Sequence, residues 1–164
     1  NYIPTMLAEG NMKTMQQFLY NFWSARTPMN PAEGWRDYLA AVRSVNASFS
    51  TTSFPGYRSD RGYVFLKYGA PDRIMESPNE PGAYPYEIWH YYEVANQRNK
   101  RFVFMTKDFV TNDYHLIHSD VIGEINNPRW QLEIYSRLQS FDEGVDQTQY
   151  EGGTRAGDLY NNPR

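Results

Sequence analysis

The spacing of apolar residues changes part-way along the chain, and this change constrains the fold more than any other feature. Up to Phe49 the apolar side chains recur every three or four residues, which is typical of helices that bury one face. From Tyr63 to Ser119 they alternate in short runs between turn residues, which is typical of strands. No helical pattern separates these runs, so the strands are expected to pair antiparallel. The sequence therefore predicts the α+β class.

The first part of the chain predicts two helices joined by a short connection. One covers residues 11–24, and the other covers residues 31–49, with Asn30 as its N-cap and Glu33 three residues after the cap. Pro28 separates them, because proline cannot continue a helical hydrogen-bond ladder. The short connection favours a roughly antiparallel pair of helices, an αα-hairpin packed on the sheet.

Alternating runs predict an antiparallel sheet of about four strands, over residues 63–68, 86–94, 101–106 and 114–119. A third helix is expected near the C-terminus, with Asn127 as its cap and Pro128 at its first position. Beyond it the chain turns to Gly, Asp, Gln, Thr and Asn. We therefore expect a single α+β domain over residues 1–141 and an extended C-terminal tail over residues 142–164.

Composition argues against several classes of function. The net charge is −3, and no Lys/Arg cluster is long enough to follow a phosphate backbone, so nucleic-acid binding is not expected. The chain has no cysteine, which excludes thiol catalysis, disulfide bonds and zinc–thiolate sites. No run of about 18 apolar residues is present, so we expect no transmembrane segment. The chain starts at Asn1, and we expect a processed chain or a piece of a longer one, with any lipid anchor upstream.

The side chains suited to catalysis or metal binding do not form a recognisable pattern. The three histidines are His90, His115 and His118. On a strand His115 and His118 face opposite sides, so they do not share a metal ion. His118 precedes Ser119, but neighbours on a strand point apart, and no G-x-S-x-G sequence surrounds the serine. The glycines form no phosphate-binding motif. We expect no enzyme, no metal and no cofactor, and keep catalysis through His118, Asp120 or Glu124 as a third hypothesis.

Aromatic residues make up 16% of the chain, so ring packing must build much of the core. The rings of the strands could also offer a platform to a sugar or a peptide, because Tyr and Trp combine a large surface with a polar tip. One face of the sheet must cover the helices, so at most half of these rings are expected to point outward. The candidate binding residues are Tyr84, Tyr86, Trp89 and Tyr91.

Charged residues and glycines surround the run at residues 63–68. The residues of this structural motif are Gly56, Asp60, Arg61, Gly62, Gly69 and Pro71. Asp60 can accept backbone N–H bonds, Arg61 can reach a carboxylate or a helix end, and Gly62 permits close packing. We interpret the motif as a corner that joins the helices to the sheet. A catalytic loop is the alternative reading of the same residues.

Five segments occur in an order that resembles the GWxTD domain family, found mainly in exported proteins of Bacteroidota-type bacteria. They are FWSAR (residues 22–26), YLAAVRSVNASF (38–49), GYRSDRGYVFLKYGAPD (56–72), YEIWHY (86–91) and HSDVIGEINNPRWQ (118–131). Tyr57 stands where the family has Trp, and Ser59 where it has Thr, whereas Gly56, Asp60, Arg61 and Gly62 match. The resemblance covers roughly residues 11–164.

This resemblance implies a protein of the periplasm or outer membrane of a Gram-negative bacterium, and the C-terminal part of a longer envelope protein. The family has no established enzymatic activity, so the resemblance transfers no catalytic residues. We expect a non-catalytic protein-interaction module that serves as an accessory subunit of an outer-membrane secretion or assembly complex, with other envelope proteins as partners. The alternative is a periplasmic glycan- or peptide-binding module that uses exposed Tyr and Trp rings.

Overall fold

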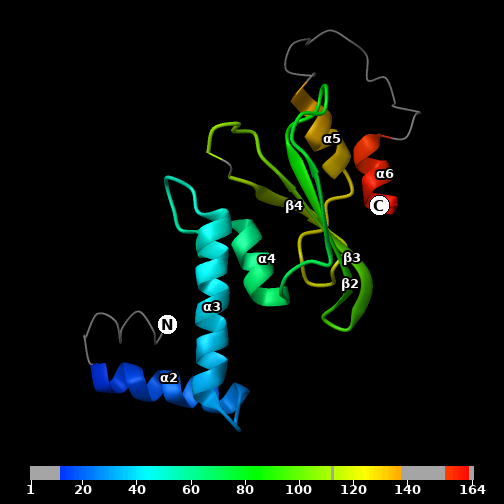
Figure 1. Ribbon diagram of the computed structural model, residues 1–164. Coiled ribbons are helices and arrows are strands. Elements are labelled where there is room, and N and C mark those ends of the chain that lie inside the picture. Colours follow the sequence, from blue (N-terminus) through cyan, green and yellow to red (C-terminus); the bar gives the residue numbers. More distant parts are fainter. Residues whose placement is uncertain (1–11, 112, 138–153, 163–164) are drawn as a thin grey trace. The chain divides into compact units, whose positions relative to one another are not determined.

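The computed structural model describes residues 12–111, 113–137 and 154–162. They belong to two compact units, which divide between Ser44 and Val45, inside helix α3 (Pro31–Phe49). The elements comprise N-terminal helices, one four-stranded antiparallel sheet and short C-terminal helices (Figure 1). The predicted α+β class is therefore confirmed. Among the described helices, none combines the length and the apolar character needed to cross a bilayer.

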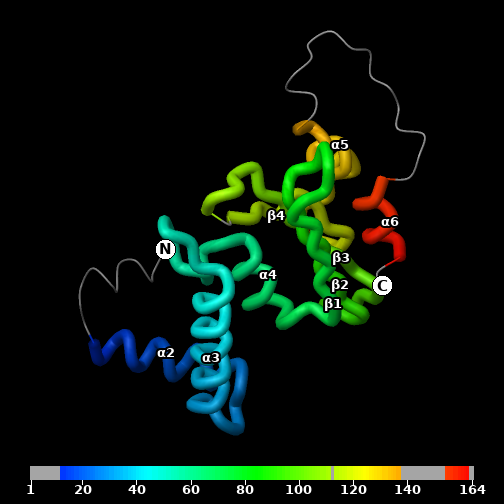
Figure 2. Tube along the Cα trace, turned by 45° about the horizontal axis from the view of Figure 1, so that its top comes forward, coloured from blue at the N-terminus to red at the C-terminus, as the bar shows by residue number. Residues whose placement is uncertain are grey.

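The first unit contains helix α2 (Met12–Arg26) and the start of α3. Asn30 caps α3 as predicted: its Oδ1 accepts from the Glu33 N–H at 3.2 Å, and its side-chain amide donates to the Glu33 carboxylate at 2.9 Å. The predicted antiparallel alignment is wrong, because α2 and α3 cross instead of running side by side (Figures 1 and 2). The ring of Trp23 packs against Trp35 and Tyr38 next to the connection. These bulky rings join the helices at that end, and α2 has no buried residue.

The second unit begins with the end of α3, a 3-10 turn η1 (Gly56–Arg58) and helix α4 (Asp60–Tyr68). Residues 63–68 were predicted as a strand, and this prediction is wrong. The Ser59 hydroxyl accepts from the Gly62 N–H at 3.0 Å and so caps the helix at its N-terminus. With the helix started at this cap, Arg61 and Val64 fall on one buried face.

The sheet consists of strands β1 (Arg73–Ser77), β2 (Tyr86–Val94), β3 (Gln97–Met105) and β4 (His115–Ser119), in that spatial order. Strands β2, β3 and β4 confirm three of the predicted strands. The fourth strand of the sheet is β1, because the predicted strand at residues 63–68 is helix α4. Ala95 and Asn96 form the two-residue turn between β2 and β3, and both have positive φ (49° and 60°). Positive φ at both positions is typical of a type I′ hairpin turn. β3 starts at Gln97, four residues before the predicted run at 101–106, so the connection between the two strands is short.

Both faces of the sheet are covered by helices of the second unit. On one side α4 packs against the sheet, and on the other side lie α5 (Trp130–Ile134) and α6 (Arg155–Asn161) (Figure 1). The first core cluster includes Tyr86, Ile88, Val103, Met105, Trp130, Ile134 and Ala156. The second includes Val64, Trp89, Tyr91, Phe102 and Phe104, with Phe49 from the end of α3 packed against it. Helices on both faces leave the central strands buried on both sides.

The C-terminal region differs from its prediction in two ways. Asn127 precedes a turn in which its Oδ1 accepts from the Arg129 N–H at 2.9 Å, so α5 begins only at Trp130. Helix α6 forms where an extended tail was predicted. Thr154 caps it by accepting from the Gly157 N–H at 3.0 Å, and Ala156 is fully buried in the first core cluster. The tail prediction is therefore wrong for residues 155–161, whereas the boundary at residue 141 lies outside the described residues.

Candidate functional site

The aromatic residues predicted to form a binding platform lie mostly in the core. Tyr86 and Trp89 have no exposed surface, and Tyr91 has 2%. Tyr84 is partly buried and packs against the first core cluster. Fewer rings point outward than the predicted upper limit of one half, because helices cover both faces of the sheet. In this run Tyr92 is the exposed ring, at 49%.

The glycines of the predicted motif bring three backbone segments into contact. A Cβ atom on Gly56 would lie 2.2 Å from the carbonyl oxygen of Val45, and a Cβ on Gly62 would lie 2.0 Å from that of Gly56. Any side chain at either position would collide with backbone atoms, which cannot move aside as a flexible side chain can. The end of α3, the η1 turn and α4 are therefore stacked at a distance that glycine alone allows.

The charged residues of the motif connect α4 to two strands. Asp60 Oδ2 accepts from the Leu116 N–H of β4 at 2.8 Å. Arg61 is buried, and its Nη1 donates to Glu87 Oε1 of β2 at 2.8 Å. At the other end of α4, Gly69 takes a φ of +87°, and its carbonyl oxygen accepts from the Tyr91 hydroxyl at 2.9 Å. Pro71 follows in the turn before β1.

Arg61 and Glu87 line a polar pocket of about 330 Å³ in the second unit. The other lining residues are Ser48, Phe49, Ile74, Glu76, Pro78 and Tyr114. The guanidinium carbon of Arg61 lies 4.4 Å from the Tyr114 ring centre and 5.0 Å from that of Phe49, so two rings hold it. Burial raises the pKa of the Glu87 carboxyl, and the charge of Arg61 only partly offsets this.

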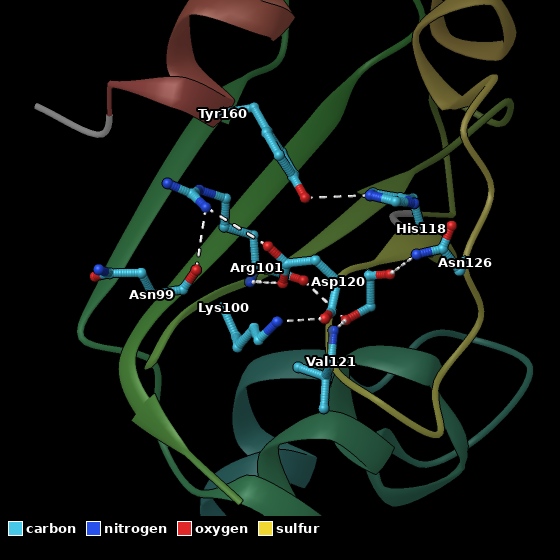
Figure 3. A network of polar contacts seen from close by, with 9 residues as sticks. Asn99, Lys100, Arg101, His118, Asp120, Val121, Asn126 and Tyr160 are labelled. Carbon is cyan, nitrogen blue, oxygen red and sulfur yellow. Dashed lines mark hydrogen bonds and ion pairs between the residues drawn. The ribbon is translucent and has the colours of Figure 1, made fainter. Parts of the chain in front are cut away.

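Asp120, a residue of the catalytic hypothesis, and its neighbour Ser119 bond to backbone groups; Figure 3 shows Asp120 beside Arg101. The Ser119 hydroxyl is fully buried, donates to the Arg101 carbonyl at 2.8 Å and accepts from the Val121 N–H at 3.1 Å. Asp120 Oδ1 accepts from the Arg101 N–H at 2.6 Å. A serine with both hydrogen-bonding functions used in this way is poorly placed to act as a nucleophile.

His118 joins β4 to the C-terminal helix (Figure 3). Its Nδ1 accepts from the Asn127 N–H at 3.1 Å, so in the neutral ring Nε2 carries the proton and donates to the Tyr160 hydroxyl at 3.2 Å. The ring stacks on Trp130 at 5.8 Å. Burial lowers its pKa, and the charge of Asp120 only partly opposes this. In the described part of the chain, His118, Asp120 and Glu124 form no hydrogen bond or ion pair with one another.

Glu124 anchors its loop to α4. Its Oε1 accepts from Lys67 Nζ at 2.6 Å, from the Tyr68 hydroxyl at 2.6 Å and from the Tyr63 hydroxyl at 3.0 Å. Burial raises the pKa of this carboxyl, but the three hydrogen-bond donors lower it by more. The net pKa is therefore below the usual value for glutamate. Within the described ranges, no three His, Asp or Glu side chains are grouped to hold a metal ion.

A comparison with protein families identifies the chain. It matches the GWxTD domain over residues 4–132. The protein belongs to the GWxTD domain family. The match includes the motif around Arg61 and ends within α5, so α6 lies beyond the matched stretch. Searches among curated proteins and among solved structures found no match.

The first unit of this GWxTD domain carries an apolar groove of about 300 Å³ between α2 and the start of α3. Its lining residues are Leu19, Tyr20, Trp23, Met29, Asn30, Pro31, Ala32 and Trp35. Tyr20 is 62% exposed and Met29 is fully exposed. The Trp23 Nε1 atom is buried and has no hydrogen-bond partner among the described residues. Leu19, Trp23 and Trp35 belong to the apolar helical stripes, for which the sequence predicts core packing, because such a stripe is usually buried against another element.

Proposed function

We propose that this GWxTD domain is a non-catalytic protein-interaction module that serves as an accessory subunit of a bacterial outer-membrane secretion or assembly complex. The observation that carries the proposal is the open apolar groove of the first unit. Large exposed apolar patches are uncommon on soluble proteins and typically mark contact sites. Residues Tyr20, Met29 and Trp35 offer the side-chain types that dominate binding energy at protein interfaces.

The groove favours an amphipathic helix of an envelope protein as its occupant. Its two walls are helices and its lining is apolar, which is the setting in which a partner helix inserts apolar side chains. The buried Trp23 indole N–H lacks an acceptor among the described residues, and such an orphan donor costs about 1–3 kcal/mol. A carbonyl or side-chain oxygen of the partner would satisfy it. Tryptophan and tyrosine are enriched at interfaces because they combine a large apolar ring with a polar tip that finds a hydrogen-bond partner there.

Two further observations support the assignment. The family resemblance implies an exported protein, and for this reason we place the module in the periplasm or at the outer membrane. The side chains of Ser119, Asp120 and Glu124 already bond to the backbone or to α4, which favours a structural role for them over catalysis.

Position-specific photo-crosslinking in native envelopes tests the proposal. A photoreactive residue at Met29 reports on the groove, and the same residue at Ile122 is the control, since Ile122 is an equally apolar and 82% exposed side chain of the second unit. We expect the Met29 probe alone to capture one defined envelope protein, identified by mass spectrometry. The captured protein is then purified and titrated against the wild-type chain and against Tyr20→Glu.

Tyr20→Glu is expected to weaken this binding at least about tenfold, because it places a charge in a desolvated apolar contact. The matched substitution Ile122→Glu is expected to leave affinity unchanged. Equal capture from both positions, or no rebinding by the purified partner, would reject the groove as the docking site. Saturable binding of an envelope glycan that Tyr20→Glu abolishes would favour the alternative glycan-binding function instead.

A further inference from the structure

The polar pocket around Arg61 is not explained by a purely structural role of the motif. Arg61 and Glu87 alone could tie α4 to β2 without leaving an open space beside them. Instead about 330 Å³ remains next to the pair, at the lower end of the range of about 300–1,000 Å³ for small-ligand pockets. A pocket of this size suits one side chain or a small molecule.

The charges that line the pocket do not cancel. Arg61 and Glu87 form a buried ion pair, which is neutral overall. Glu76 lies directly opposite Glu87 on the neighbouring strand β1, and it also lines the pocket. Like charges in directly opposed positions of adjacent strands destabilise a sheet. The Glu76 carboxylate has no hydrogen bond or ion pair within the described residues. Glu76 is exposed, so it adds one solvated negative charge to the lining of the pocket.

Tyr114 adds a polar group to the pocket wall. The residue as a whole is 8% exposed and lines the pocket, and its hydroxyl bonds to no other residue that the structure describes. The hydroxyl is not among the described buried polar atoms that lack a partner, so it is accessible to a group bound in the pocket. Its ring packs against the Arg61 guanidinium, which fixes its position on the pocket wall. The hydroxyl can accept a hydrogen bond from a cation bound beside it.

We propose that this pocket binds an alkylammonium group, the side chain of a lysine presented by a partner polypeptide. An ammonium has three separate donors, and the pocket offers three separate acceptors: the Glu76 carboxylate, the Tyr114 hydroxyl and the remaining lone pairs of Glu87. A guanidinium, in contrast, is a planar fork suited to one carboxylate. Ile74 and Pro78 provide apolar walls for the alkyl stem. The site lies wholly in the second unit, and it goes beyond the proposed function because it does not depend on the groove of the first unit.

An NMR titration of the ¹⁵N-labelled chain with Nα-acetyl-lysine methylamide tests the proposal. The Trp89 indole is the reporter, because its Nε1–H donates to Glu87 Oε2 at 3.1 Å. We expect a saturable shift of this resonance with the lysine derivative and none with Nα-acetyl-norleucine methylamide, which keeps the stem and lacks the charge. The arginine derivative is expected to bind more weakly than the lysine derivative.

Two pocket variants and one control assign the contacts. Glu76→Gln should weaken binding by up to about fivefold, the scale of one partly solvated charge interaction. Tyr114→Phe keeps the ring and should weaken binding by about three- to tenfold, the scale of one typical hydrogen bond. Glu93→Gln removes an exposed carboxylate from the far end of β2 and should bind like the wild type.

The proposal is overturned if no saturable shift occurs, or if the norleucine derivative binds as well as the lysine derivative. It is equally overturned if Nα-acetyl-glutamate methylamide binds in preference, since the pocket would then be an anion site built on Arg61. Loss of affinity in Glu93→Gln to the same extent as in Glu76→Gln would show an effect of net charge only, and would also reject the site.

Discussion

Replacing Gly62 with alanine tests whether the close backbone approach at the motif organises the second unit. Alanine usually stabilises a helix interior by about 0.5–1 kcal/mol relative to glycine. At Gly62 the new Cβ would lie 2.0 Å from the Gly56 carbonyl oxygen and 2.9 Å from Val45 Cγ1. Overpacking costs about 1–3 kcal/mol, and a clash with backbone belongs at the upper end. The expected net loss of unfolding free energy is about 2 kcal/mol, or a decrease in Tm of roughly 4–8 °C.

The assay is urea unfolding followed by tryptophan fluorescence and by far-ultraviolet circular dichroism. Gly157→Ala is the matched control, since Gly157 also lies in a short helix of the second unit. Its Cβ would meet only side-chain ends, Thr154 Oγ1 at 3.1 Å and Gln131 Nε2 at 3.2 Å, and these can shift by a few tenths of an ångström. The control is therefore expected to stay within about 1 kcal/mol of the wild type.

The reasoning is refuted if Gly62→Ala unfolds at the same urea concentration as the wild type or at a higher one. Such a result would mean that α4 can move away from the η1 turn at little energetic cost. The stacked backbone segments would then not be a fixed part of the fold.

Three further substitutions probe the polar contacts of the second unit. Arg61→Met should lower the free energy of unfolding by about 3–5 kcal/mol, because it leaves the buried Glu87 charge without its cation. Adding Glu87→Gln to this variant should recover part of the loss. If the two losses in urea unfolding are strictly additive, the ion pair is contradicted. The Glu124 carboxyl has a net pKa below its usual value, because its three hydrogen-bond donors outweigh burial. The carboxylate therefore stabilises the fold above the unfolded pKa of about 4.3, and this stabilisation is lost as pH falls through the folded pKa. The difference in unfolding free energy between wild type and Glu124→Gln should therefore shrink below about pH 4, and a constant difference would be evidence against these bonds. Burial lowers the His118 pKa, so the unfolded chain binds more protons there and His118 should contribute a fall in stability as pH decreases below about 6.5, by at most about 1.4 kcal/mol per pH unit. His118→Gln should show a shallower decline than the wild type between pH 7 and pH 5, and the part that remains includes His90, whose pKa burial also lowers.

The class and most strands of this fold could be predicted from the sequence, because long runs with a clear period leave one interpretation. Helix α4 could not be predicted from periodicity alone. Every residue from Tyr63 to Leu66 is apolar, so a short window fits a strand and a helix equally well. The deciding signal is Ser59 with Asp60 directly after it, a helix-capping residue and an acidic first turn.

The burial of the aromatic strand residues depends on information far along the chain. Whether the second face of the sheet is exposed is decided by α5 and α6, and α6 carries few apolar residues in a polar C-terminal stretch.

The partner of Arg61 could not be predicted from the sequence either. The sequence predicts a carboxylate or a helix end as its partner. Glu87 lies 26 residues away, and the choice of Glu87 depends on how α4 packs on β2. Local pattern cannot supply a tertiary register of this kind.

The order of the strands has a consequence for how the sheet assembles. Each strand pairs with the one that follows it in sequence, so every pairing closes a short loop. Low sequence separation between contacting residues speeds folding, and the tight turn at Ala95 and Asn96 is the natural nucleus. We expect high φ-values there and low ones in α6 (Arg155–Asn161), which is separated from β4 by more than thirty residues. The meander can therefore form before α6 covers its part of one face.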